Sequence, residues 1–224
     1  EHLMYSCKDI QRIKEELEAY DQVECDSDSQ SPKVIVKLLL GNWNQAVELT
    51  KGQRSLGWTA SSNPLPIVTA ATFLALTAES DQTPQTIQDF VAAAFEGDFY
   101  DFDDALNLSL EEDELENERK LGQALLLERL QVVLSELSSS PEKRKEILNW
   151  TKKAVDKRID GIVSKKYRHS YWKAAQIAAA WVETLIANDK NSQAKTYLEN
   201  LRKKRYPRHS AFRQELNQAC ENLL

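Results

Sequence analysis

The sequence KKYRHSYWK at residues 165–173 returns in altered form as KRYPRHSAFR at residues 204–213, and this repeat decides the fold. Both copies contain Arg-His-Ser, then one residue, an aromatic residue and a base, and their histidines, His169 and His209, lie 40 residues apart. A period of about 34–47 residues with two helices in each period is typical of stacked helix pairs. Because one pair cannot bury its apolar face alone, the repeat predicts that neighbouring pairs stack on one another.

Helix signals extend outward from the repeat on both sides. Ser140 followed by Pro141 is a start signal, because serine caps a helix and proline suits its first turn, and this helix is expected to run to about Ser164. Capping residues and 3.6-residue periodicity predict further helices over residues 6–20, 34–40, 43–50, 64–78, 84–95, 110–137, 170–187, 192–205 and 210–224. No segment gives a convincing strand pattern, and Gly and Pro number only six each, which disfavours a fold with many turns. The predicted fold class is all-α, an irregular α-solenoid of stacked helix pairs.

The domain organisation follows from the polar stretch DSDSQSP at residues 26–32, which reads as a linker. Residues 1–30 are expected to form an N-terminal helix and this linker. Residues 31–224 are expected to form a single helical-repeat domain with an acidic loop at 96–118.

Charge is divided unevenly along the chain. Residues 1–140 carry a net charge of −16, whereas residues 141–224 carry +10. Such opposed parts indicate either internal complementarity or a basic surface for an acidic partner. One hypothesis is that the acidic tract at 98–118 lies near the basic turns around Arg168 and Arg205 as a weak, salt-sensitive cover.

Two stretches resemble tetratricopeptide-type repeats. The first is LGNWNQA at residues 40–46, and the second is residues 173–207, where a helix, a short turn, a second helix and a closing proline follow one another. If Ala194 takes the small position of that repeat, Trp181 is well placed, but Leu201 stands where a small residue belongs, so the repeats are degenerate. The resemblance implies a TPR-like stack of helix pairs that offers a surface to a protein partner.

The segment 154–216 is also similar to C-terminal helical regions of bacterial proteins of unknown function, some of which carry SWIM-type zinc fingers. The similarity rests on the stretches around KYRHSYWKAA and YPRHSAFRQEL. A zinc finger needs Cys and His at ligand spacing, and this chain has no such spacing, so no zinc function carries over.

The sequence favours neither a metal site nor a cofactor. The three cysteines, Cys7, Cys25 and Cys220, show no CxxC spacing and are expected to be reduced thiols of a cytoplasmic protein. His169 and His209 each precede a serine expected to cap a helix, and one repeat separates them, which is too far for one ion. We expect both rings to pack at turns between repeats. The acidic stretch 101–112 fails as a calcium loop, since Ala and Leu stand at its fifth and sixth positions.

Enzymatic and membrane functions are not expected. The chain contains no nucleophile-elbow, phosphate-loop, dinucleotide or His-Glu-x-x-His motif. The longest apolar run, at residues 65–78, holds 14 residues and a proline, whereas a membrane span needs about 20. The charged N-terminal segment shows no signal peptide, so we expect a cytoplasmic protein.

The function that remains is protein–protein recognition, in which helical repeats hold a peptide or another domain of the parent protein. The partner is expected to be acidic. The residues expected to bind it are basic ones at the repeat turns: Lys166, Arg168, Lys204, Arg205 and Arg208.

The alternative function is nucleic-acid association through the same basic residues. Aromatic residues are interleaved with them and would stack on bases: Tyr167, Trp172, Tyr206 and Phe212. The competing prediction is that such aromatics belong to the core, and in particular that Trp172 and Trp181 are both mostly buried.

Overall fold

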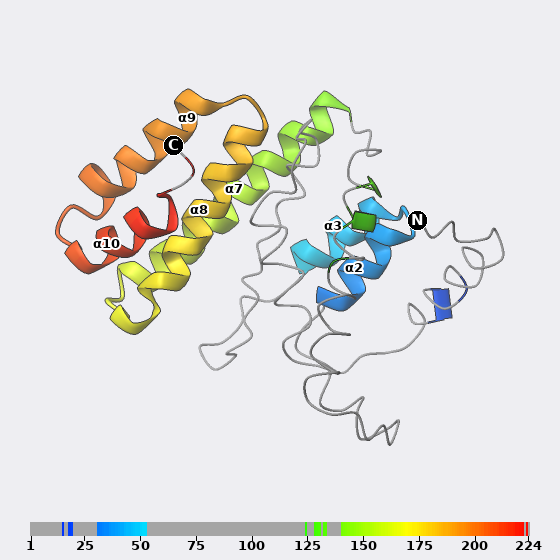
Figure 1. Ribbon diagram of the computed structural model, residues 1–224, viewed down its shortest axis with the longest axis horizontal. Coiled ribbons are helices and arrows are strands. Elements are labelled where there is room, and N and C mark those ends of the chain that lie inside the picture. The colour runs from blue at the N-terminus through cyan, green and yellow to red at the C-terminus, as the bar shows by residue number, and fades with distance from the viewer. Residues whose placement is uncertain are drawn as a thin grey trace, which may run out of the picture. The chain divides into compact units, whose positions relative to one another are not determined.

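Figure 1 shows the computed structural model of the chain. The structure describes residues 15, 18–19, 31–52, 124, 128–130, 132–133, 140–221 and 223. Every regular element within these residues is a helix, which confirms the all-α prediction for this part of the chain. The chain divides into two units, Glu1–Asn63 and Pro64–Leu224, and each is described by itself. The boundary expected near residue 30 falls inside the first unit, and the single domain expected over 31–224 stays a prediction.

The first unit contains a helical hairpin of α2 (Ser31–Leu39) and α3 (Trp43–Gly52), close to the two helices expected there. Gly41 ends α2 with a positive φ of 74°, a conformation that glycine adopts without steric cost. Its N–H bonds to the carbonyl of Leu38, and the next N–H bonds to that of Lys37, which is the Schellman pattern of a helix end. The buried side chains of the hairpin are Val34, Val36, Leu38, Ala46 and Val47.

The second unit is described mainly through α7 (Pro141–Val163), α8 (Tyr171–Ala187), α9 (Asn191–Asn200) and α10 (Ser210–Ala219). The start signal at residues 140–141 is confirmed, because the Ser140 side chain accepts a hydrogen bond from the Lys143 N–H at 3.2 Å. A 3-10 turn, Arg168–Ser170, precedes α8, and a π-helical turn, Leu201–Arg205, extends α9. The predicted boundaries of these four helices are therefore close to the observed ones, although α10 stops five residues early.

Helix α8 is the centre of this unit, with α7, α9 and α10 packed against it (Figure 1). The sequence of α8 explains its central position, because alanines and large apolar residues cover most of the circumference of the helix. The side chains that are almost completely excluded from solvent come from all four helices and the π-helical turn: Ile159, Val163, Ala174, Ala178, Val182, Ala194, Leu201, Phe212 and Leu216.

Two expectations about this unit are wrong. Trp181 is buried with 4% of its surface exposed, but Trp172 is 46% exposed. Nine residues put the two indoles about half a turn out of phase, and the side of α8 that carries Trp172 faces water. The expected serine caps are also absent: Ser170 holds the N-cap position of α8 but its side chain forms no capping hydrogen bond, and at α10 the N-cap position belongs to His209, again without a side-chain cap.

Several expected features lie outside the described residues. They are the helices over 64–78 and 84–95, most of those over 6–20 and 110–137, and the acidic loop at 96–118 with its hypothetical cover over the basic turns.

Candidate binding surface

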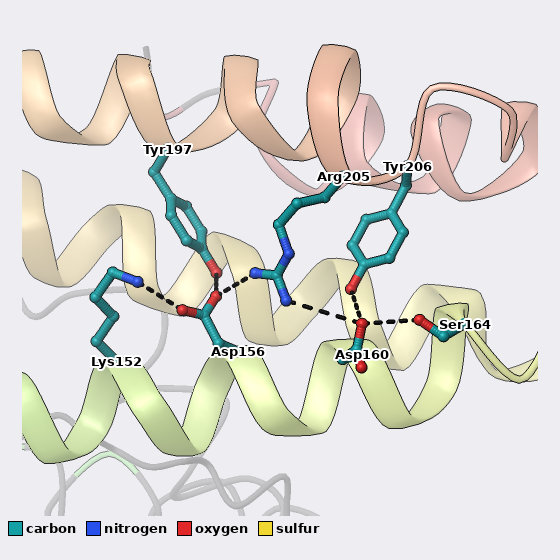
Figure 2. A network of polar contacts seen from close by, with 7 residues as sticks. All are labelled: Lys152, Asp156, Asp160, Ser164, Tyr197, Arg205 and Tyr206. Carbon is teal, nitrogen blue, oxygen red and sulfur yellow. Dashed lines mark hydrogen bonds and ion pairs between the residues drawn. The ribbon is translucent and has the colours of Figure 1, made fainter.

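The two copies of the repeat lie at the same end of the second unit. Helices α7 and α9 run in the same direction, as Figure 2 shows, so the turns that follow them meet at one end. A hydrogen bond of 3.0 Å joins the Tyr171 hydroxyl, after the first turn, to Nδ1 of His209, in the second. We call the residues 164–173 and 201–213 the basic end.

The basic end concentrates positive charge. Residues 161–182 and 200–214 contain ten Lys and Arg residues and no Asp or Glu. Helices α8 and α10 also begin here, and a helix N-terminus carries about half a positive elementary charge. The nearest described acidic groups on α7, Asp156 and Asp160, are engaged by residues of the unit itself.

Four of the five basic residues predicted from the sequence are free for a partner. Lys166, Arg168, Lys204 and Arg208 are exposed, and none of them forms an ion pair with any residue that the structure describes. Lys166 has a positive φ of 60° at the Schellman end of α7, where glycine would fit without strain. The position therefore carries a lysine at the expense of local stability.

Arg205 differs from the other four because its charge is used inside the unit (Figure 2). Its Nη1 donates to Oδ1 of Asp156 at 2.6 Å, and its Nη2 lies 3.9 Å from Oδ1 of Asp160. The guanidinium thus ties the end of α9 to α7. Its expected role in gripping a partner stays a prediction, but an internal role is now evident.

Asp156 is the centre of a larger polar network between α7 and α9. Besides Arg205, it accepts hydrogen bonds from Lys152 Nζ at 2.6 Å and from the Tyr197 hydroxyl at 3.1 Å. Burial alone would raise its pKa, but the bonds and charges of Lys152 and Arg205 outweigh burial and hold the pKa below its ordinary value. Burial, followed by the charge of Asp156, raises the pKa of Tyr197 well above its ordinary value.

One turn further along α7, Asp160 forms the second half of the network. Its Oδ1 accepts hydrogen bonds from Ser164 Oγ at 2.8 Å and from the Tyr206 hydroxyl at 3.0 Å. These bonds lower the pKa of Asp160, and burial raises the pKa of Tyr206 to about 12. This network was not predicted from the sequence; the signal that could have found it is the spacing of the two aspartates, four residues apart on one helix face. That spacing does not indicate which residues lie opposite.

The two histidines fulfil their expected packing role to different degrees. His209 is half-buried, bonded to Tyr171, and packed edge-on against Tyr206 with ring centres 5.8 Å apart. His169 is exposed, and its ring lies edge-on to that of Tyr167 with ring centres 6.4 Å apart. Within the described part of the chain, no group of three or more His, Cys, Asp or Glu residues is arranged to hold a metal ion.

A cleft of about 440 Å³ lies beside the network, over α8. Trp181, Leu185 and Leu201 are among its apolar lining residues, and its charged lining residues are Lys152, Asp156 and Arg205. Because both cations are already paired with Asp156, the cleft offers less uncompensated positive charge than the basic end does.

Comparisons with protein-family models, with curated proteins and with solved structures give no match to this chain. Among the helices that the structure describes, none is both long and apolar enough to cross a membrane. Any functional assignment therefore rests on the geometry and charge of the residues themselves.

Proposed function

We propose that this protein is a non-enzymatic protein–protein interaction module whose basic end binds an acidic peptide or an acidic segment of another domain. The observation that carries the proposal is the meeting of two turns that together hold ten basic and no acidic residues. Complementary charge of this kind speeds the encounter with a partner and fixes its orientation. The partner would meet exposed cations on a rigid support, since the turns are tied to each other and to α7.

The proposal includes a helical-repeat architecture, an irregular α-solenoid of TPR-like helix pairs. Its support is the relation between the two repeat copies: each is followed by a helix, α8 or α10, and these two helices pack against each other. Stacked helix pairs would then present equivalent turns at one end of the stack. Repeat proteins build extended binding surfaces in this way.

Charge reversal tests the proposal. Arg168→Glu and Arg208→Glu should each weaken binding of a ten-residue polyglutamate peptide at least about fivefold at low salt, because each replaces attraction by repulsion at the surface. The matched control is Lys195→Glu, which changes the net charge equally at an exposed position within α9, outside the basic end. Calorimetric titration should show little effect for the control. Equal losses in all three variants would mean that only net charge matters and would refute a specific site.

The alternative function, nucleic-acid association, is favoured by one observation, the exposed indole of Trp172 with the Lys173 ammonium close to its ring. Two of the other interleaved aromatics cannot stack on bases, because Tyr206 and Phe212 are buried. A titration with single-stranded DNA separates the two functions. Binding tighter than that of the peptide, falling steeply with salt as phosphate contacts do, would favour the alternative.

A further inference from the structure

Trp172 is the exposed aromatic side chain of the basic end. It lies in the first turn of α8, four residues after Arg168, and Lys173 Nζ lies 5.3 Å from the centre of its ring. Val132 is the other large apolar side chain that is exposed among the described residues. An exposed indole does not contribute the stabilisation that a buried large aromatic side chain contributes. The position of Trp172 is therefore not explained by the core.

The repeat shows what the fold itself requires at this place. Phe212 is the counterpart of Trp172 in the second copy, and it is completely buried. In the first copy the neighbouring Tyr171 takes the buried role, with its ring 5.9 Å from that of Phe212. Since Tyr171 already supplies the aromatic contact between α8 and α10, Trp172 is left on the surface beside Lys173.

We infer that the acidic partner also carries an apolar side chain, and that this side chain packs on Trp172 while the surrounding cations hold the flanking carboxylates. The inference rests on the proposed function, because it specifies the partner of the same surface. Exposed ion pairs alone contribute little affinity, since both charges stay hydrated. Trp and Arg are the residue types that most often dominate binding energy, and Trp172, Arg168 and Arg208 share this end. Trp172 thus selects among acidic segments, and the cations attract them all.

Two peptides of equal length and charge test this inference on the full chain. Both contain eight glutamates around one central residue, which is phenylalanine in one peptide and serine in the other. Burial of the phenylalanine on Trp172 should make the first peptide bind about tenfold more tightly than the second. In Trp172→Ala and in Trp172→Gln this preference should fall below about twofold, with the affinity for the serine peptide unchanged. Circular dichroism checks that both variants keep the native helix content.

The outcomes separate the inference from the proposed function. If Arg168→Glu leaves binding of both peptides unchanged, or neither peptide binds, the proposed function fails and the inference with it. If both peptides bind through Arg168 but with equal affinity, or if the tenfold preference persists in both Trp172 variants, the proposed function stands and the inference is refuted. If Trp172→Ala weakens binding of single-stranded DNA but not of the phenylalanine peptide, the indole serves base stacking instead, and the inference is again refuted.

Discussion

The two copies of the repeated turn, residues 165–173 and 204–213, share a sequence but not an environment. In the second copy Phe212 is buried and Ala211 is exposed, whereas in the first copy Tyr171 is buried and Trp172 is exposed. The buried aromatic has moved by one position. After the shared Arg-His-Ser, the core takes one aromatic from each copy, and the first copy carries one more at this place than the core uses.

The same contrast holds for the polar residues that precede these aromatics. Tyr206 is buried and donates to Asp160, and His209 is bonded to Tyr171, so the second copy is fastened to the unit. His169 and Lys166 of the first copy are exposed. The second turn therefore anchors the basic end, and the first turn presents more of its side chains to a partner.

Replacing Phe212 and Trp172 should have the most different effects on stability. Phe212→Ala should destabilise the fold by about 3–5 kcal/mol, because it removes a completely buried ring and leaves a cavity. Trp172→Ala, at the equivalent position, should change stability by less than about 1 kcal/mol. Urea unfolding followed by circular dichroism measures both. A cost above about 2 kcal/mol for Trp172→Ala would show that its indole belongs to the core after all.

Removing the carboxylate that fastens α9 to α7 should have the next largest effect. Asp156→Asn should cost about 1.5–3 kcal/mol at neutral pH, because hydrogen bonds from Lys152 and Arg205 to a charged acceptor are lost. The pKa of Asp156 is lower in the folded protein than in the unfolded chain, so its stabilisation is present at neutral pH and is lost as pH falls through the folded value. The variant should therefore lose less stability than the native protein between pH 7 and pH 3. Equal losses over that range would contradict this role.

Alkaline pH should affect the second turn through Tyr206. Its pKa of about 12 lies above the ordinary value of about 10 for the unfolded chain. The unfolded state therefore releases its proton first, and the contribution to stability is full below pH 10 and is lost as pH rises toward 12. Tyr206→Phe should lose about 1 kcal/mol at pH 7 with the bond to Asp160, but should show a flatter decline above pH 10. An unchanged alkaline profile would argue against this contribution.

The smallest change in stability is expected at Lys166, where folding and binding favour different residues. Lys166→Gly should stabilise the protein by about 0.5–1 kcal/mol, because glycine relieves the positive φ of that position. The same variant should weaken binding of acidic peptides, since a cation of the basic end is lost. Asp189→Gly is the matched control, because Asp189 has a φ of 57° at the Schellman end of α8. It should gain similar stability without weakened binding. Equally weakened peptide binding in the Asp189→Gly control would show that the charge of Lys166 has no specific role in binding.

The sequence predicted the four helices from residue 140 onward because their start and stop signals are local. Ser140 caps its helix as expected, and Pro207 follows the end of the π-helical turn. The basic end was also predictable, since the repeat places equivalent turns on one side of stacked helices. The partner of Arg205 was not predictable, because Asp156 lies 49 residues away and only the packing of both α7 and α9 on α8 brings the two together. The exposure of Trp172 was not predicted for a similar reason. Periodicity places Trp172 and Trp181 on opposite faces of one helix, but it does not show which face lacks a neighbouring helix.

Mapping a bound acidic peptide onto the backbone amides by NMR shows directly whether the basic end is the binding surface. We expect polyglutamate to shift the amide signals of residues 164–173 and 201–213 together, with one affinity for both turns and a loss of the shifts at high salt. We also expect unshifted signals over residues 31–52 and at the opposite end, around residues 188–195. Shifts that lie in the cleft beside Trp181 or are spread evenly over all exposed lysines would contradict binding at the basic end, and so would an absence of shifts.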